Sequence, residues 1–263
     1  MISRLYRYFY RKWPVPTKVR LYHGQKVFLP RAGYSDLVLK DQGAYELANS
    51  RILNQLARPH SWVLDVGTNF GLMSIPILAS CPEVQVLSFE PSKNARKYLC
   101  RTMQVSSFKN RWKLVSKCVG AHLGDVEFTL SAGSNVEFDG IRHTGRVKAS
   151  RTCQVPMTTL DEEWKRLGFP AISVIKSDVE GAELGVLQGA AHCIAKERPF
   201  VLIEWNKSNF QAYGVATGDL LKLVEELAFD IYALPHMIPL TNRSEMELQM
   251  LVTESFLLAP RGQ

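Results

Sequence analysis

The sequence predicts an α/β protein built on a doubly wound, mostly parallel β-sheet. From residue 62 onward, short apolar segments typical of buried strands alternate with segments of helical spacing. The first strand leads through a glycine-containing loop into a helix. This alternation is typical of parallel sheets that carry helices on both faces. A chain of 263 residues is long enough for such a domain.

The expected elements follow in a regular order. Apolar residues at helical spacing predict a first helix at residues 45–56. We expect parallel strands at residues 62–67, 84–90, 112–120, 172–181 and 199–205. We expect helices at residues 71–80, 92–106, 182–197 and 217–229. Two final strands, at 230–235 and 254–260, are separated by a Pro-containing loop and are expected to pair antiparallel at one sheet edge.

Residues 121–160 interrupt the alternation. GDVEFTL and RTCQVPMTTL look like strands, with a loop rich in Gly, Asn and Asp between them. We expect an inserted β-hairpin beside the crevice, facing the substrate. The chain is thus divided into an extension and lead-in, residues 1–44, and a main domain, residues 45–263. In the lead-in, KVFLP and DLVLK are expected to be strands or irregular structure.

Composition places the chain among ordinary globular proteins, because 46% of residues are hydrophobic and 22% are charged. The cysteines are scattered without a CxxC pair, which fits reduced thiols better than disulfides or a zinc site. No apolar run approaches the length of a membrane span, and no signal-peptide core precedes a cleavage site. We therefore expect a cytoplasmic protein.

The first 20 residues, MISRLYRYFYRKWPVPTKVR, are basic and aromatic, and they contain no acidic residue. Such a segment is typical of peripheral contact with an anionic membrane, here the inner membrane face. The alternative is a helix packed on the domain with its charges in water. Because the basic excess lies in this extension and not along the catalytic loops, nucleic acid is an unfavoured partner.

The loop after the first main-domain strand, Asp65–Gly71, has the composition of a nucleoside-binding turn. Gly67 permits a tight turn, and Gly71 lets the next helix pack close to the strand. Glu90 ends the following strand, where a carboxylate can accept both ribose hydroxyl hydrogens. A nicotinamide dinucleotide needs GxGxxG, whereas D-x-G-x-x-x-G suits a nucleoside without pyrophosphate, such as S-adenosyl-L-methionine. Asp65 is a candidate anchor for its ammonium group, directly or through water.

The stretch VIKSDVEG, residues 174–181, begins like a buried strand and ends in charge. Side chains alternate across a strand, so Lys176, Asp178 and Glu180 would share one face. Three buried charges would be costly unless they are paired or solvated at a site. We therefore expect them at the carboxyl end of the strand, where open α/β sheets bind their ligands.

Five motifs occur in the order VLDVGTNFG, SFEPS, TTLDEEW, VIKSDVEGAELGVLQGA and ERPFVLIEW. Together they resemble the FkbM family of S-adenosylmethionine-dependent methyltransferases over roughly residues 45–263. The resemblance implies a Rossmann-like class I methyltransferase fold, whose sheet has seven strands with an antiparallel edge strand. It also implies methylation of a hydroxyl on a small molecule, a sugar, or a lipid-linked glycan or polysaccharide unit.

The family motifs carry over residue by residue. The cofactor motifs match Asp65, Gly67, Asn69, Gly71, Glu90 and Pro91. Glu46 matches more loosely a glutamate ahead of the first strand. The fourth-strand motif matches Lys176, Asp178, Glu180 and Gly181. Thr68 replaces the usual alanine, and Ser177 stands where an apolar residue is common.

Asp178 is our candidate general base, because an alcohol attacks poorly unless its proton leaves as the bond forms. Such a base contributes about 10²–10⁴-fold in rate. In-line positioning of the reacting atoms contributes more, roughly 7–11 kcal/mol. Lys176 and Glu180 would orient or stabilise the site. In the alternative, Asp178 holds the cofactor and Lys176 pairs with Glu180. Two carboxylates are a weak metal signal, so no metal is expected.

Other residues and functions remain alternatives. His143 and His236 are rival bases, although loop histidines are more often surface residues. Trp205 and Asn206 follow a strand and either bind substrate or pack internally. An RNA or protein methyltransferase is a second function, but an amine-directed enzyme would commonly show Asn/Asp-Pro-Pro-Tyr where this chain has DVEG. A non-catalytic cofactor-binding module is a third, against which the intact carboxylates weigh.

Overall fold

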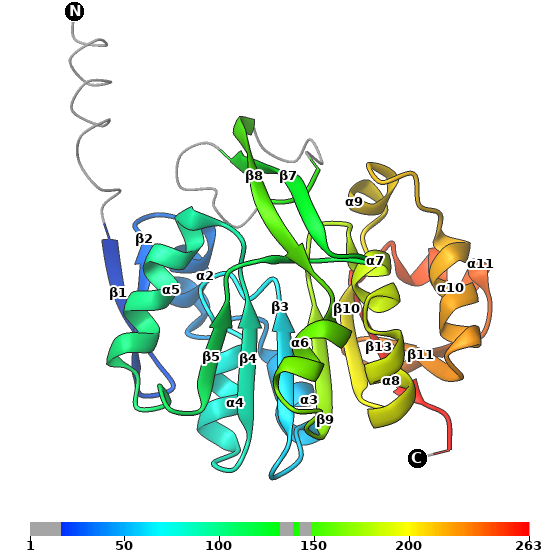
Figure 1. Ribbon diagram of the computed structural model, residues 1–263, viewed down its shortest axis with the longest axis horizontal. Coiled ribbons are helices and arrows are strands. Elements are labelled where there is room, and N and C mark those ends of the chain that lie inside the picture. Colours follow the sequence, from blue (N-terminus) through cyan, green and yellow to red (C-terminus); the bar gives the residue numbers. More distant parts are fainter. Residues whose placement is uncertain (1–16, 132–138, 143–148, 263) are drawn as a thin grey trace, which may run out of the picture.

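The computed structural model describes residues 17–131, 139–142 and 149–262, and it shows a central sheet with helices on both faces (Figure 1). In spatial order the strands of this sheet are β12 (Ile238–Leu240), β11 (Phe229–Ala233), β13 (Ser255–Pro260), β10 (Phe200–Glu204), β9 (Ile172–Ser177), β3 (Trp62–Val66), β4 (Gln85–Phe89) and β5 (Trp112–Val115). The five strands from β10 to β5 are parallel. The predicted doubly wound Rossmann-like sheet is therefore confirmed.

The order of the parallel strands fixes where a ligand can bind. From β3 the chain builds β4 and β5 on one side, and it later adds β9 and β10 on the other. The order in which strands are added to the sheet thus reverses between β3 and β9. Crevices at the carboxyl ends of strands beside such a switch point are the usual ligand sites of open α/β sheets.

The antiparallel part of the sheet differs in detail from the prediction. The sheet has eight strands where seven were predicted. The antiparallel strand β13 lies between β10 and β11, and the short β12 forms the edge, antiparallel to β11. The segment that contains β12 looked like a loop because it includes Pro239, which lacks an N–H donor. An edge strand tolerates proline because one side of it needs no hydrogen bond.

Helices on the two faces bury two apolar cores. One face carries α3 (Leu47–Leu56), α4 (Ser74–Ser80) and α5 (Lys93–Val105), and the other carries α6 (Leu160–Arg166), α7 (Glu183–Gln188), α8 (Ala191–Glu197) and α10 (Thr217–Glu226). Val63 packs in the first core and its neighbour Leu64 in the second. Because both faces are covered, these strands read as continuous apolar runs, which is why their positions could be predicted.

The lead-in contains the antiparallel pair β1 (Thr17–Tyr22) and β2 (Gln25–Pro30), followed by α2 (Tyr34–Gln42). KVFLP is therefore a strand as expected, whereas DLVLK belongs to a helix. Short apolar runs do not distinguish the two by periodicity. The Phe28 N–H donates to Thr102 Oγ1 on α5 at 3.0 Å, which ties the lead-in to the main domain.

Two expectations concerned membranes, one about the basic N-terminal segment and one about membrane-spanning helices. Residues 1–16, which hold most of the expected membrane-contacting segment, lie outside the described residues. Within the part of the chain that the structure describes, no helix has the length and apolar character needed to cross a membrane.

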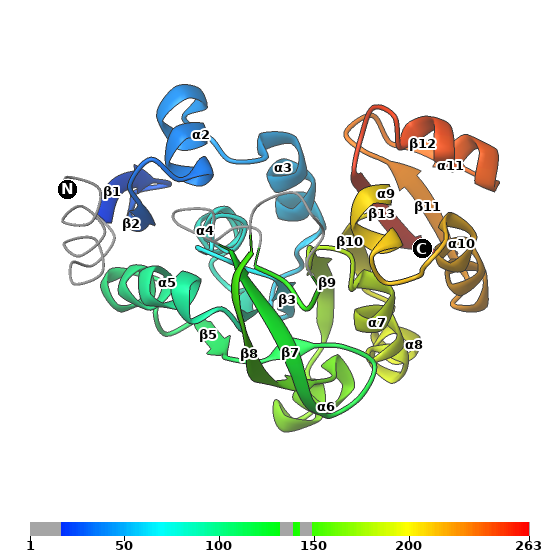
Figure 2. The same cartoon turned by 90° about the horizontal axis from the view of Figure 1, so that it is seen from above.

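The predicted hairpin within residues 121–160 is confirmed. β7 (Gly124–Ser131) pairs antiparallel with β8 (Ala149–Thr158), and β6 (Cys118–Val119) pairs parallel with β8. The single strand expected at 112–120 is thus two, β5 and β6, which lie in different sheets. Figures 1 and 2 show that the hairpin stands over the carboxyl-terminal edge of the central sheet.

The turns after β3 and β9 contact each other at Gly67. This glycine has a φ of +73°, and a Cβ on it would lie 1.8 Å from the carbonyl oxygen of Asp178. The Asp178 N–H in turn donates to the Val66 carbonyl at 3.1 Å. Only glycine supplies both the left-handed conformation and the room for this contact.

We predict that Gly67→Ala destabilises the protein more than Gly24→Ala does. Gly24, in the β1–β2 turn, has the same φ of +73° but open space within 4 Å of where its Cβ would lie. Gly24→Ala should cost about 1 kcal/mol for backbone strain alone. Gly67→Ala should cost roughly 1–3 kcal/mol more because the β9 turn must move. Urea unfolding would measure both, and equal losses of stability would contradict the role assigned to the contact.

Candidate active site

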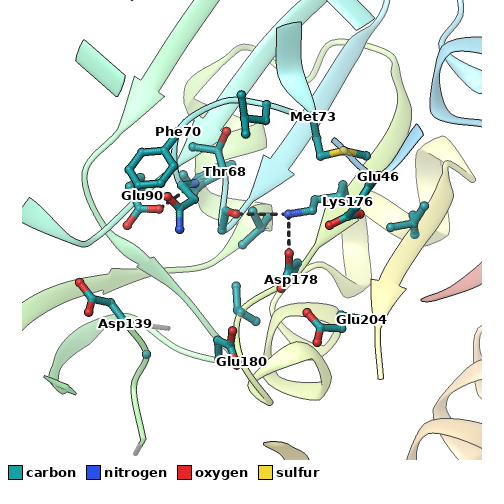
Figure 3. A pocket seen from close by; sticks show the side chains of 18 of the residues that line it. Glu46, Thr68, Phe70, Met73, Glu90, Asp139, Lys176, Asp178, Glu180 and Glu204 are labelled. Atoms are coloured by element: carbon teal, nitrogen blue, oxygen red, sulfur yellow. Dashed lines mark hydrogen bonds and ion pairs between the residues drawn. The ribbon is translucent and has the colours of Figure 1, made fainter. Parts of the chain in front are cut away.

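A cavity of about 520 Å³ lies at the carboxyl ends of β3, β4, β9 and β10. Small-molecule sites typically enclose about 300–1,000 Å³. Phe128 and Gly140 of the inserted region line it, as do Tyr34 of α2 and Val252, which precedes β13. Charged side chains from several strand ends point into it (Figure 3).

The loop after β3 is held from below by Asp65. The Asp65 Oδ2 accepts hydrogen bonds from the Thr68 and Ser74 hydroxyls at 2.6 and 2.5 Å. Asp65 is 1% exposed, and it is absent from the described residues that line the cavity. Thr68, the departure from the family's alanine, thus adds a bond inside the loop. Gly71 also lies below the cavity, where a Cβ would meet the Trp112 ring at 2.4 Å.

Glu90 closes the β4 side of the cavity and binds the same loop. Its Oε2 accepts the Asn69 N–H at 2.9 Å, and its Oε1 accepts the Ser92 N–H at 2.7 Å. Burial raises the pKa of Glu90 to about 7, against the lowering effect of these two hydrogen bonds. Asn69 itself has a φ of +52°, and its buried Oδ1 has no hydrogen-bond partner among the described residues.

Lys176 lies in the part of the cavity formed by β9 and β10, away from Glu90. Its Nζ lies 3.1 Å from Asp178 Oδ2, 3.2 Å from the Gly67 carbonyl oxygen and 3.8 Å from Asp65 Oδ1. Burial alone would lower the pKa of Lys176, but the carboxylates of Asp178, Asp65 and Glu46 outweigh burial and hold this pKa above its usual value. The ammonium therefore stays charged and links the β3 loop to the β9 turn.

Glu46 enters the cavity from the start of α3. The residue adopts a left-handed conformation with φ 41° and accepts a hydrogen bond from Asn49 Nδ2 at 3.1 Å. The residue as a whole is exposed, and it lines the cavity (Figure 3). There burial first, and then the negative charge of Asp178, raise its pKa.

Glu204, the last residue of β10, is a cavity residue that sequence reasoning missed. It lines the same end as Asp178. Burial first, then the charge of Asp178 and a hydrogen bond with the Asp178 carboxylate, raise the pKa of Glu204 well above its usual value. The available signal was the glutamate in VLIEW, a charged residue at the end of an apolar strand.

Glu180 reaches the cavity by a different route from the one predicted. β9 ends at Ser177, so Glu180 lies in the following turn with a φ of +56° and not on a strand face. Its Oε2 accepts a hydrogen bond from Asn209 Nδ2 at 2.9 Å. Lys176 forms its ion pair with Asp178, two residues along the chain.

Glu183 holds this turn from inside the protein. Its Oε1 accepts the N–H groups of Val179 and Gly181 at 2.8 and 3.3 Å. Glu183 is 1% exposed, and burial raises its pKa to about 8. It is therefore neutral at pH 7 and shapes the turn that presents Asp178.

The structure brings most of the predicted site residues to one cavity. Those that line it are Glu46, Gly67, Asn69, Glu90, Pro91, Lys176, Asp178 and Glu180. Among the described lining residues there is no histidine: His236 lies elsewhere and His143 is outside the described part of the chain. Trp205 is a core residue stacked on Phe210. The described residues contain no cluster of acidic, histidine or cysteine side chains arranged to hold a metal ion.

The parallel sheet with a cavity at its switch point places the protein among the Rossmann-like α/β proteins. The family model "Methyltransferase FkbM domain" matches residues 65–231. The chain belongs to the FkbM methyltransferase family, as its motifs indicated, and its cofactor is S-adenosyl-L-methionine.

Individual relatives share a quarter or less of their aligned residues with this chain. The 2-O-methyltransferase NoeI of Sinorhizobium fredii is 24% identical over 174 residues, which are 59% of this chain and 68% of that protein. The FkbM methyltransferase structure from Methylobacillus flagellatus has a TM-score of 0.47 and 16% identity, covering 80% of this chain and half of the other. A putative caffeoyl-CoA O-methyltransferase from Staphylococcus aureus gives 0.49 and 8%, covering 88% and 94% of the two chains.

We predict that Glu183 makes the protein less stable as the pH rises. Its folded-state pKa of about 8 exceeds the ordinary value of 4.5, so the folded state binds more protons between these pH values. Stability must then fall with rising pH through this window, by a few kcal/mol on the order of 1.4 kcal/mol per pKa unit. Glu183→Gln keeps the accepting oxygen and should reduce the slope of unfolding free energy against pH. The same change at exposed Glu127 is the control, and parallel slopes for all three proteins would refute the prediction.

Proposed function

We propose that the protein transfers a methyl group from S-adenosylmethionine to a hydroxyl oxygen of a sugar or a related neutral small molecule. The observation that supports this proposal is the Lys176–Asp178 ion pair, which lies in the same cavity as Glu90. One end of the cavity offers groups for a nucleoside. The other offers a carboxylate for a proton.

The chain's own residues fit the cofactor. Glu90 is placed to accept the ribose hydroxyls, and the unpartnered Oδ1 of Asn69 offers a further acceptor. Asp65 lies below the loop, so Glu46 is the better-placed carboxylate for the ammonium of the methionine part. The bound cofactor supplies an electrophilic methyl group on a positively charged sulfur.

Asp178 would accept the proton of the acceptor hydroxyl. Its side chain is 26% exposed, so the acceptor can reach it, while the Lys176 ammonium fixes its orientation. The β9 turn, held by Glu183, positions Asp178 and Glu180 together. Lys176 keeps its charge and stabilises the negative charge around it, so it acts as an electrostatic anchor and not as the base.

The charge of the cavity bears on the class of acceptor. Asp178, Glu180 and Glu254 line the cavity with carboxylates, and the Lys176 ammonium lies beside Asp178. A phosphate or carboxylate on the acceptor would be repelled by these carboxylates. A neutral hydroxyl compound fits better than RNA does, because RNA carries phosphates. The 2-O-methyltransferase among the relatives supports transfer to an oxygen.

The proposal is tested with methyl-labelled S-adenosylmethionine and four acceptor pools: neutral glycosides, glycolipids, RNA and protein. We expect label in a glycoside or glycolipid, and Asp178→Asn should lower kcat by about 10²–10⁴-fold with little change in cofactor affinity. Asp41→Asn, at an exposed position of α2, is the control for a lost carboxylate. Label in RNA or protein would overturn the acceptor class, and an unchanged kcat in Asp178→Asn would overturn the base.

We further predict that the affinity for S-adenosyl-L-homocysteine rises with pH up to about 7, the pKa of Glu90, and then levels off. The ribose hydroxyls donate to the ionised carboxylate, so at lower pH binding must first remove a proton. The dissociation constant should increase about tenfold per pH unit below this value. Calorimetry between pH 5.5 and 8 measures it, and Glu90→Gln should bind more weakly with a flatter profile. A pH-independent affinity of the wild type would exclude Glu90 as the ribose ligand.

A further inference from the structure

Glu204 and Asp178 occupy equivalent positions on neighbouring strands. β9 and β10 run parallel, with Ile203 opposite Ser177. Glu204 and Asp178 each follow this residue pair, so their side chains leave the sheet at the same level. Both line the cavity, and they point toward the same space in Figure 3.

The contact between these two carboxyl groups requires a shared proton. The Asp178 carboxyl lies close enough to Glu204 to help raise the pKa of Glu204. Ionised carboxylates are acceptors only, so a hydrogen bond between two of them exists only when one is protonated. Lys176 Nζ donates to Asp178 Oδ2 at 3.1 Å and so favours the charge on Asp178. The proton therefore resides on Glu204, which donates to Asp178.

The surroundings make this proton sensitive to added charge. Burial first, and then the carboxyl groups of Asp178, Glu180 and Glu183, raise the pKa of Glu204. Glu46 and Lys176 act on the Asp178 side of the pair. A positive charge brought into this cavity favours the ionised form of a nearby carboxyl group.

We propose that Glu204 and Asp178 share one proton, that the pair releases it when the positively charged cofactor binds, and that the emptied pair then receives the hydroxyl proton of the acceptor. The inference rests on the proposed methyl transfer to oxygen. In it Asp178 contacts the acceptor, and Glu204 is a positioning residue that acts through Asp178.

The charges balance through the transfer. The acceptor oxygen forms its bond to the methyl carbon, the carbon–sulfur bond breaks with its electron pair on sulfur, and the O–H proton passes to Asp178. The positive charge on sulfur and one negative charge of the pair disappear together. The net charge of this partly buried site is therefore the same before and after the step, which avoids the cost of leaving an uncompensated charge there.

The test compares proton release on binding of two nucleosides to the complete protein. S-Adenosylmethionine carries the sulfonium, whereas S-adenosylhomocysteine is the neutral thioether with the same ribose and amino acid groups. Calorimetry near pH 7 in buffers of different ionisation enthalpy gives the protons released by each. Any release from Glu90 occurs with both ligands and cancels in the difference. We expect S-adenosylmethionine to release up to about one proton more.

Variants assign this difference to the pair. Glu204→Gln can still donate a hydrogen bond to Asp178, but its amide does not titrate. The difference in proton release between the two nucleosides should therefore vanish, while S-adenosylhomocysteine still binds. Glu204→Asp should restore part of it. Glu226→Gln, at an exposed position of α10 away from the cavity, should leave it unchanged.

The outcomes distinguish failure of the shared-proton inference from failure of the proposed methyl transfer. Equal proton release by both nucleosides in the wild-type protein, or a difference that survives Glu204→Gln, would overturn the shared proton while leaving methyl transfer in place. Failure of both nucleosides to bind would overturn the proposed function and this inference with it. If Glu204→Gln fails to fold, equal proton release by the two nucleosides in the wild-type protein still overturns the shared proton.

Discussion

The buried ammonium of Lys176 is the interaction on which the rest of the site depends. A cation that is almost removed from water is tolerated only when carboxylates and carbonyl groups surround it. Lys176 finds these groups on two different strand ends, the Gly67 carbonyl after β3 and the Asp178 carboxylate after β9. These contacts of Lys176 fix the loop after β3 relative to the turn after β9. The absence of a side chain at Gly67 allows the two turns to come this close.

Buried carboxyl groups are the second feature of the cavity. Burial raises the pKa values of Glu46, Glu90, Glu183 and Glu204, although each accepts or shares a hydrogen bond. Their roles differ with their neighbours: Glu183 shapes a turn, Glu90 faces the nucleoside end, and Glu204 contacts Asp178. Because a nearby positive charge favours the ionised form of a carboxyl group, these groups are the ones we expect to respond to a charged ligand.

The cavity is built from the parallel strand ends together with the inserted hairpin region and segments near both ends of the described chain. The parallel strands carry the cofactor loop and the charged turn. The β7–β8 region lines the cavity from above through Phe128 and Gly140. On the opposite side Tyr34 and Val252 are exposed where they line it.

The sequence by itself determined the alternating strands and helices, the glycine-containing loop after the first parallel strand and eight of the residues that line the cavity. These features are local, because periodicity and turn chemistry are written in neighbouring residues. The tertiary structure alone decided that β13 lies inside the sheet, that Asp65 supports the loop from below and that Glu204 meets Asp178. Each of these depends on strand order and register, which join residues far apart in the chain. Strand alternation likewise failed for Glu180, because β9 ends before that residue and a turn directs its side chain.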